Sequence, residues 1–399
     1  MADLTKLLKE EPKKPEADLN FTIDEKDHLT EDAKKDTPQK PDKSNQKLSK
    51  HRLSKFTKKH YLISGLVLIF FAVILALIIT TKPANRPVVI TTKKVVTPKP
   101  IIYYSPLTGG VVTKAESLLP VTAVMVENSD AARPQSGLSQ AGVVFEALAE
   151  GGVTRFMALF QEGQPSSIGP IRSARPYFID WELGFNASYV HVGGSPAALT
   201  QIQTDNVKDI NQFYHGNNFT RITSRIAPHN VYTSMSSLLN LESSLGFGYT
   251  KFVGFPRKAD QPAKVPNATN INLSLSNSDY AVSYIYNKVN NSYLRSEAGS
   301  PMTDANTNAQ LDPKVVIAMI VPWSYGLLDS SGANYINYSD IGSGNADIFQ
   351  DGTLTQAIWT KASPTSQIVF TTLNNVPIQL NTGQTWITAV GTNSSISYQ

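Results

Sequence analysis

The chain has 399 residues, 41% of them apolar, and a formal net charge of +4, which allows two folded domains of ordinary soluble composition. It contains no cysteine, so disulfides, thiolate catalysis and a cysteine-linked lipid anchor are excluded. Gly-x-Ser-x-Gly, Walker, His-Glu-x-x-His and cysteine-based zinc motifs are also absent from the sequence, which weakens the usual hydrolase, NTPase and zinc-enzyme interpretations.

Residues 1–60 form a strongly polar N-terminal segment, rich in Lys, Asp, Glu, Pro and Ser and poor in aromatic residues. Such a composition cannot bury enough apolar surface to offset the entropy that is lost on ordering. We therefore expect residues 1–60 to be a disordered tail.

An uncharged segment follows, with the sequence YLISGLVLIFFAVILALIITT over residues 61–81. Its length of about twenty residues is that of a helix crossing a bilayer, and it is apolar on every face, unlike a core helix. Seven Lys or Arg and no acid lie between Lys43 and His60, whereas the far side opens with only Lys82 and Arg86. The positive-inside rule then predicts a single-pass signal-anchor in the cell membrane, with the tail cytoplasmic and the later residues extracytoplasmic. This topology accounts for the basic flank, so we expect no nucleic-acid partner.

Residues 82–100 mix proline, lysine and β-branched residues without helical periodicity, which predicts an extended linker. Residues 101–250 alternate short apolar runs with capped segments, a pattern that favours an α/β domain. Ser195 before a proline is a typical helix start, and Gly151-Gly152 is a typical helix end. The expected strands cover residues 121–127, 154–161 and 189–192, and the expected helices cover residues 139–150, 174–185, a segment that begins after Ser195, and 234–245.

Residues 251–399 are rich in Asn, Ser and Thr, with alternating apolar residues and Asn-Asn, Asp-Gly and Asn-Thr-Gly turns. This composition, the alternation and the turn motifs predict a mostly β C-terminal domain. The four tryptophans are interpreted as anchors of the core or of a domain interface. The expected fold is therefore an α/β N-terminal ectodomain plus a mostly β C-terminal domain, preceded by one transmembrane helix and a disordered tail. Strands are expected over residues 280–286, 315–320, 355–360 and 368–372.

Arginines in the motifs GGVTRF and IGPIRSARP form the first candidate site. Arg172 and Arg175 lie three residues apart at an expected strand-to-helix junction, and Arg155 could complete the cluster. Guanidinium groups and helix N–H groups together suit a phosphate, pyrophosphate or carboxylate. The alternative is that these arginines pair with nearby carboxylates and lock loops in place. Those carboxylates are Glu127, Glu146, Glu150 and Asp180.

Two further sets of residues are candidates for ligand binding. Glu127 and Asn128 end an expected strand, and Arg133 follows them, where a base or metal ligand is often placed in an α/β sheet; capping of the next loop is the structural alternative. Histidine and arginine residues near two Gly-rich or capped turns offer acid–base groups and an anion site, although such histidines are more often packed and hydrogen-bonded. This last set comprises His191, Ser195, Arg225 and His229.

The motifs VMVENSDAARPQSGLSQAGVVFEALAEGGVTRFMALFQ, IGPIRSARPYFIDW, YVHVGGSPAAL, APHNVYTS, GSGNADIFQDGT and NTGQTWI occur in this order over about residues 103–390. In this respect the chain resembles the YerB-like family of bacterial lipoproteins. The resemblance implies a two-domain extracytoplasmic protein of unassigned biochemical function. Because this chain has no lipid-bearing cysteine, the segment at 61–81 would replace the lipid as the anchor.

A fainter resemblance is to the LytR-CpsA-Psr transferases, which move cell-wall polymers from polyprenyl pyrophosphate carriers. Their single N-terminal helix, strand-to-Arg junction and Gly-Gly segment correspond here to residues 61–81, 169–173 and 191–194. Ser173 and Thr154-Arg155 stand where this resemblance would require acids, which puts Mg²⁺ chemistry in doubt.

The sequence thus predicts an envelope protein that binds an anionic ligand or a protein partner and carries no cofactor. This hypothesis leans away from an enzyme, because an arginine cluster occurs without an obvious nucleophile. One rival hypothesis is a phosphotransferase that acts on lipid-linked glycans and uses Mg²⁺ held by Glu127 or Asp180. The other rival is a structural scaffold in which every arginine is paired internally.

Overall fold

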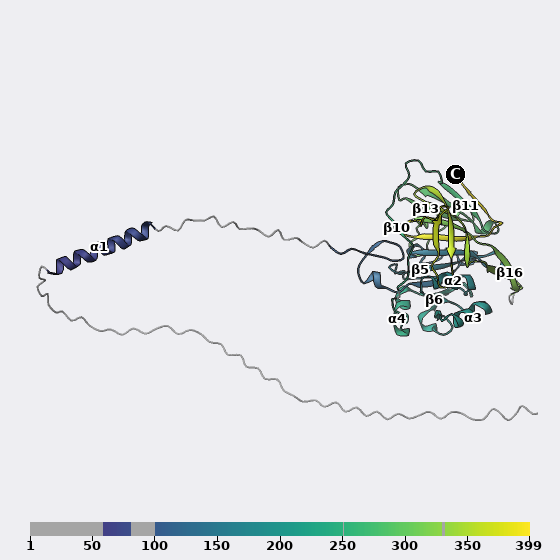
Figure 1. Ribbon diagram of the computed structural model, residues 1–399. Coiled ribbons are helices and arrows are strands. Elements are labelled where there is room, and N and C mark those ends of the chain that lie inside the picture. The colour runs from purple at the N-terminus through teal and green to yellow at the C-terminus, as the bar shows by residue number, and fades with distance from the viewer. Residues whose placement is uncertain (1–58, 81–99, 250, 329–331) are drawn as a thin grey trace, which may run out of the picture. The chain divides into compact units, whose positions relative to one another are not determined.

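The computed structural model describes residues 59–80, 100–249, 251–328 and 332–399, with side chains from Gly65 onward. The chain divides into two units, Met1–Val95 and Val96–Gln399. Nearly all of the expected tail (1–60) and linker (82–100) lies outside the described residues. Figure 1 shows the elements of the second unit gathered into one body, in which α2, α3 and α4 lie beside the strands β5 and β6.

The first unit contains the helix α1 (Lys59–Thr80), which begins at Lys59 and includes residues 61–80 of the uncharged segment. From Gly65 to Thr80 its side chains are apolar apart from the terminal Thr80, whose hydroxyl donates to the carbonyl of Ala76 at 2.9 Å. Across the described part of the chain, no helix meets the combined length and apolarity that a membrane crossing requires.

The second unit is built on one ten-stranded sheet to which both halves of the sequence contribute. The strand β22 pairs in parallel with β15 on one side and with β4 on the other, so it joins the two halves edge to edge. In spatial order the strands are β20 (Val369–Thr372), β19 (Thr353–Lys361), β18 (Gly342–Gln350), β15 (Val315–Ile320), β22 (Thr385–Val390), β4 (Val143–Leu148), β5 (Thr154–Phe160), β3 (Thr122–Glu127), β6 (Ser188–His191) and β7 (Lys208–Asn211).

Both faces of this sheet are covered, which explains why its central strands are continuous apolar runs. On one face α2 (Pro176–Leu183) and α3 (Pro196–Thr204) pack against β3, β4 and β5. On the other face α4 (Met235–Leu245) covers the N-terminal half, and a five-stranded sheet covers the C-terminal half. That second sheet has the order β14 (Ser300–Pro301), β13 (Ser292–Glu297), β12 (Ala281–Asn287), β11 (Asn270–Ser274) and β23 (Ser395–Tyr398).

A buried ion pair fastens the five-stranded sheet to the large one. Arg295 of β13 is fully buried and reaches Glu146 of β4 at 2.9 Å, while its guanidinium lies 4.4 Å from the ring centroid of Trp386 in β22. The other carboxylate oxygen of Glu146 accepts from Trp386 Nε1 at 3.0 Å and from Thr388 Oγ1 at 3.2 Å. Both oxygens of the buried Glu146 carboxylate therefore accept hydrogen bonds, as a buried charge requires.

Short elements complete the second unit, each with two strands or a single helical turn. The two-stranded sheets are β1 (Tyr103–Tyr104) with β2 (Val111–Val112), β8 (Thr220–Arg221) with β9 (Val231–Tyr232), β10 (Arg257–Lys258) with β21 (Leu380–Asn381), and β16 (Trp323–Leu328) with β17 (Asn334–Tyr338). The 3₁₀ turns are η1 (Glu116–Leu118), η2 (Asp130–Ala132), η3 (Leu138–Gln140), η4 (Glu150–Gly152), η5 (Gly216–Asn218) and η6 (Ser278–Tyr280).

Most expected elements are confirmed, but the helix predicted over residues 139–150 is wrong. That segment forms η3 and then β4, a strand buried along its whole length. The run Val143-Val144-Phe145 is β-branched and aromatic, which suits a central strand that is covered on both faces. The described residues of the second unit are accordingly mostly β with few helices, and Trp181, Trp359 and Trp386 are core anchors as predicted.

Candidate functional site

Three neighbouring strands of the large sheet, β3, β6 and β7, run parallel and end at the same edge. Their last residues are Glu127, His191 and Asn211. Ligands of open α/β sheets bind beyond the carboxyl ends of parallel strands, where the loops leave a crevice. This edge is therefore the expected place for a binding site.

The Glu127 cluster comprises Glu127, Ser129, Arg172 and His229. One carboxylate oxygen of Glu127 lies 2.9 Å from His229 Nδ1, 3.2 Å from Arg172 Nε and 2.8 Å from Ser129 Oγ. Arg172 is held in place by backbone bonds, since its N–H donates to the carbonyl of Met125 and its carbonyl accepts from the N–H of Val192. The cluster thus brings together the end of β3, the loop before α2 and the loop before β9.

The outer ends of Arg172 and His229 are available for a ligand. Among the described residues, the two terminal nitrogens of Arg172 and the Nε2 atom of His229 have no partner. The side chains are 27% and 21% exposed, whereas that of Glu127 is only 4% exposed. The second carboxylate oxygen of Glu127 is buried and accepts no hydrogen bond from the described residues. Glu127 therefore orients Arg172 and His229, whose outer nitrogens are partly exposed.

Arg155 and Arg175 occupy a different, closed cluster around Glu150. Arg175 donates through Nε and Nη2 to both oxygens of Glu150, and Arg155 Nη2 lies 3.6 Å from the same carboxylate. Arg155 Nη1 also donates to the carbonyl of Ser173 at 2.9 Å. Burial alone would raise the pKa of Glu150, but hydrogen bonds from Arg175 and the charges of both arginines outweigh it and lower that pKa. Burial lowers the pKa of Arg155 to about 10.

Asn128 and Arg133 lie in the loop after β3, which also carries Ser129 of the Glu127 cluster. The buried Asn128 donates from Nδ2 to Thr154 Oγ1 and to Glu297 Oε1, both at 2.6 Å. Arg133 bridges Asp130 at 3.1 Å and Glu297 at 3.3 Å. These contacts tie the loop after β3 to the five-stranded sheet.

The remaining candidates lie nearby, mostly in structural positions. His191 is buried, with Nδ1 at 2.7 Å from the carbonyl of Gly193 and Nε2 at 2.8 Å from Asp209. Ser195 caps α3, where its hydroxyl accepts from the N–H of Ala198 at 3.3 Å. Arg225 donates to the carbonyls of Ala131 and Pro134 at 3.1 and 2.8 Å, which holds the loop of His229 against the loop after β3.

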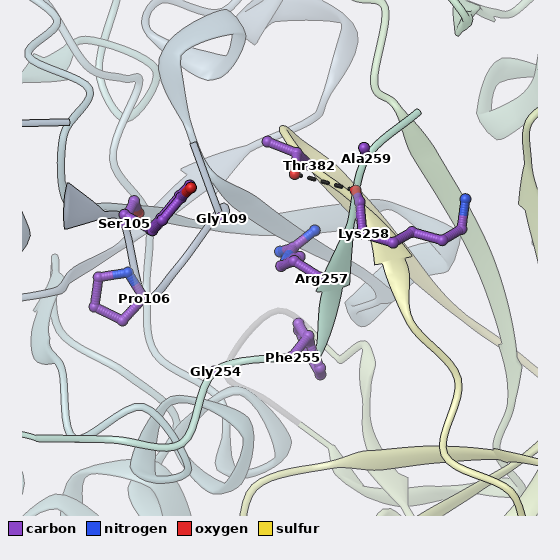
Figure 2. Close-up of a pocket in the computed structure, with 10 residues that line it drawn as sticks. Ser105, Pro106, Gly109, Gly254, Phe255, Arg257, Lys258, Ala259 and Thr382 are labelled. Carbon is purple, nitrogen blue, oxygen red and sulfur yellow. Dashed lines mark hydrogen bonds between the residues drawn. The ribbon is translucent and has the colours of Figure 1, made fainter. Parts of the chain in front are cut away.

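A pocket of about 570 Å³ elsewhere in this unit is less suited to a charged ligand (Figure 2). Arg257 lines it, but its terminal nitrogens donate to the carbonyls of Leu107, Asn381 and Gly383 and to Thr385 Oγ1. The other cation, Lys258, donates to Asp351 and Asn381. Both cations are thus engaged in hydrogen bonds that stabilise the fold, and they are not available to a ligand.

Sequence reasoning missed Asp209 and Glu297, two partners of candidate residues. Asp209 lies 18 positions from His191 and Glu297 lies 169 positions from Asn128, and no motif marks either residue. Burial raises the pKa of Glu297 to about 7, although the charge of Arg295 opposes that rise. The described ranges contain no group of three or more His, Cys, Asp or Glu that is arranged to hold a metal ion.

Comparisons with known proteins are consistent over most of the second unit. Residues 107–248 match the family model of the "Protein of unknown function (DUF3048) N-terminal domain", and residues 271–387 match that of the C-terminal domain. A protein of Bacillus subtilis (strain 168), "Putative lipoprotein YerB", is 34% identical over 259 residues, which are 64% of this chain and 77% of that protein. The crystal structure of YerB protein from Bacillus subtilis is similar with a TM-score of 0.66 and 30% identity, covering 74% of this chain and 99% of that chain. These matches bear out the resemblance to the YerB-like family, and they do not show the likeness to LytR-CpsA-Psr transferases.

Proposed function

The chain belongs to the DUF3048 family, and from this premise we propose that it is a membrane-anchored extracytoplasmic envelope protein that binds an anionic group through Arg172 and His229. The observation that carries the binding proposal is the pair of side chains oriented by Glu127, Arg172 and His229, whose outer nitrogens have no partner among the described residues.

Residues 61–81 supply the proposed anchor. The related YerB is named a lipoprotein, a class held at a membrane by lipid, whereas this chain has no cysteine to carry one. The uncharged segment has the length of a membrane helix, and its basic N-terminal flank favours a cytoplasmic tail.

The charge balance distinguishes Arg172 from the other two arginines. Arg155 and Arg175 share one carboxylate and are buried, so an anion would have to displace Glu150 to reach them. Arg172 contacts Glu127 through Nε alone, which leaves the bidentate end of the guanidinium for a phosphate or carboxylate. A protonated His229 beside it would add a second positive charge.

Calorimetric titration of the full chain in detergent with pyrophosphate tests the binding site. We expect Arg172→Ala to weaken binding about tenfold, which is the order expected for a lost charge-assisted hydrogen-bonded pair. Arg221→Ala is the matched control, since it removes the same charge from an exposed arginine that donates to Asn230. Equal weakening by both variants would indicate a non-specific charge effect. Because Arg172→Ala leaves Glu127 buried without its cation, Arg172→Lys and a ligand-free melting curve accompany it.

The absence of cysteine makes the topology directly testable. Single cysteines are introduced as Ser44→Cys in the tail and Lys288→Cys in the exposed turn between β12 and β13. In intact cells a membrane-impermeant maleimide should label position 288 and spare position 44. Labelling at 44 and protection at 288 would reverse the proposed orientation, and recovery of the protein in the soluble fraction would exclude the anchor.

A further inference from the structure

We propose that a pocket beside the Glu127 cluster, at the ends of β6 and β7, binds the pyranose rings of a glycan. This site is separate from the anion site, and Arg172 is not among its lining residues. The pocket has a volume of about 470 Å³, which lies within the usual range for small-ligand sites.

The pocket lies at the same carboxyl edge of the parallel strands as the Glu127 cluster. Ser173 lines its wall and immediately follows Arg172 in the chain. Gly193, which follows β6 with a φ of +58°, forms another part of the wall, and a Cβ added there would approach the ring of Phe213 to 3.0 Å. The missing side chain therefore lets the ring lie against the backbone.

Two consecutive aromatic side chains line the opening. Phe213 is 67% exposed and Tyr214 is 76% exposed, so neither is part of the core. Exposed large aromatic side chains that gather at a concave site often mark a ligand-binding surface. The C–H face of a pyranose ring is apolar and flat, and it stacks on such side chains while its hydroxyls point outward.

The same pocket offers polar groups that match hydroxyls. Gln203 presents an exposed amide, and Asp209 has a side chain that is 30% exposed. Only one oxygen of Asp209 is engaged among the described residues, by His191. A carboxylate or carboxyl beside an amide can both accept from and donate to neighbouring ring hydroxyls.

The hydrogen bonds of His191 constrain how the imidazole and the Asp209 side chain share their protons. Its Nδ1 faces the carbonyl of Gly193, which only accepts, so that nitrogen must donate. Its Nε2 faces Asp209, so either the imidazole carries a second proton or the carboxyl carries one. In both cases His191 holds Asp209 in a single orientation toward the pocket, as a positioning residue.

The test is a saturation-transfer NMR titration of the full chain in a polyoxyethylene detergent, which has no sugar headgroup. The probes are chitotetraose, cellotetraose and maltotetraose, each to millimolar concentration. We expect at least one tetrasaccharide to bind, and the double variant Phe213→Ala/Tyr214→Ala to weaken it by about tenfold or more, since aromatic side chains dominate such contacts. Tyr214→Trp should retain binding because a larger ring still stacks.

Tyr325→Ala is the matched control, since Tyr325 is an equally exposed aromatic (68%) outside this pocket. The proposal is overturned if none of the three tetrasaccharides binds, or if the double variant binds as well as the unaltered chain. It is also overturned if Tyr325→Ala weakens binding as much as the double variant does. Pyrophosphate and the tetrasaccharides are titrated separately against the unaltered chain, so failure of the anion site and failure of the glycan site give different results.

Discussion

Two arginine–carboxylate clusters lie in the N-terminal half of the second unit and differ in how far their cations are exposed and in how many arginines share the carboxylate. In the Glu150 cluster, two buried arginines converge on one carboxylate. In the Glu127 cluster, one buried carboxylate holds an arginine and a histidine whose outer ends are exposed. The same residue types thus lock a loop in one place and present donors to solvent in the other. The difference is one of burial and of the ratio of cations to carboxylates, and the motifs that contain these residues look alike.

The largest effect is expected from Glu150→Gln, which removes the charge that compensates Arg155 and Arg175. Loss of one partner from a buried ion pair typically costs about 3–5 kcal/mol, because the remaining charge stays buried. The midpoint of urea unfolding at pH 7 measures this change. Because the pKa of Glu150 is lowered by folding, its stabilisation exists above the ordinary value of 4.5 and is lost as the pH falls through the folded value. The loss of stability caused by Glu150→Gln should therefore be smaller at acidic pH than at pH 7. Asp205→Asn, at an exposed position, should leave the midpoint unchanged.

Glu182 in α2 extends the comparison to a buried carboxylate that has no ion pair among the described residues. Burial raises its pKa to about 8, and the charge of Lys208 opposes the rise only in part. The stability that the protonated form contributes is fully present below pH 4.5 and is lost as the pH rises through about 8. We expect Glu182→Gln to stabilise the fold at pH 9 by roughly 2–4 kcal/mol and to have little effect at pH 5. Melting curves at the two pH values measure the difference.

Glu242→Gln provides the control for that result, because burial raises the pKa of Glu242 to about 7. Both gains should begin as the pH rises above 4.5, but the gain from Glu242→Gln should level off near pH 7 and be smaller, whereas the gain from Glu182→Gln should grow until about pH 8. A gain that is independent of pH in both variants would show that improved packing, rather than loss of a buried charge, is responsible.

The smallest effect is expected from Glu127→Gln, and it concerns binding. Removing the carboxylate should raise the affinity for pyrophosphate by about threefold to tenfold, since a competing negative charge near Arg172 is lost. Calorimetric titration compares the variant with the unaltered chain. A fall in affinity would mean that Glu127 contributes mainly by orienting Arg172 and His229, and a variant that binds as before would remove the cluster from the anion site.

The strands and helices of the second unit were largely predictable because their signals are local. Ser195-Pro196 and Ser234 mark helix starts, and β-branched runs such as Val315-Val316 mark strands. The exception is β4, where the segment after Ser139 has a helix-like cap while its apolar residues serve a strand covered on both faces. Local capping was outweighed there by tertiary burial.

The candidate residues were predictable as a set, but their grouping was not. The carboxylates Glu127 and Glu150 were among the expected alternatives for pairing with the arginines, and the structure assigns one to Arg172 and the other to Arg155 and Arg175. The His229–Glu127 contact joins residues about a hundred positions apart. Such contacts depend on how the loop before β9 folds back, and no spacing in the sequence encodes that path.

The position of β22 between β15 and β4 has a consequence for how the protein is made. A ribosome delivers the N-terminal half long before β22 emerges, and until then β4 has an unpaired edge on that side. A chain truncated after Gly383 should therefore be cleaved rapidly in limited proteolysis, and it should lose protection in β4 as well as in β15. During synthesis the open edge of β4 is therefore exposed for most of the time that the chain takes to emerge, and it could pair with other nascent chains. A nearly complete polypeptide is still incompletely folded at that stage and accessible to proteases.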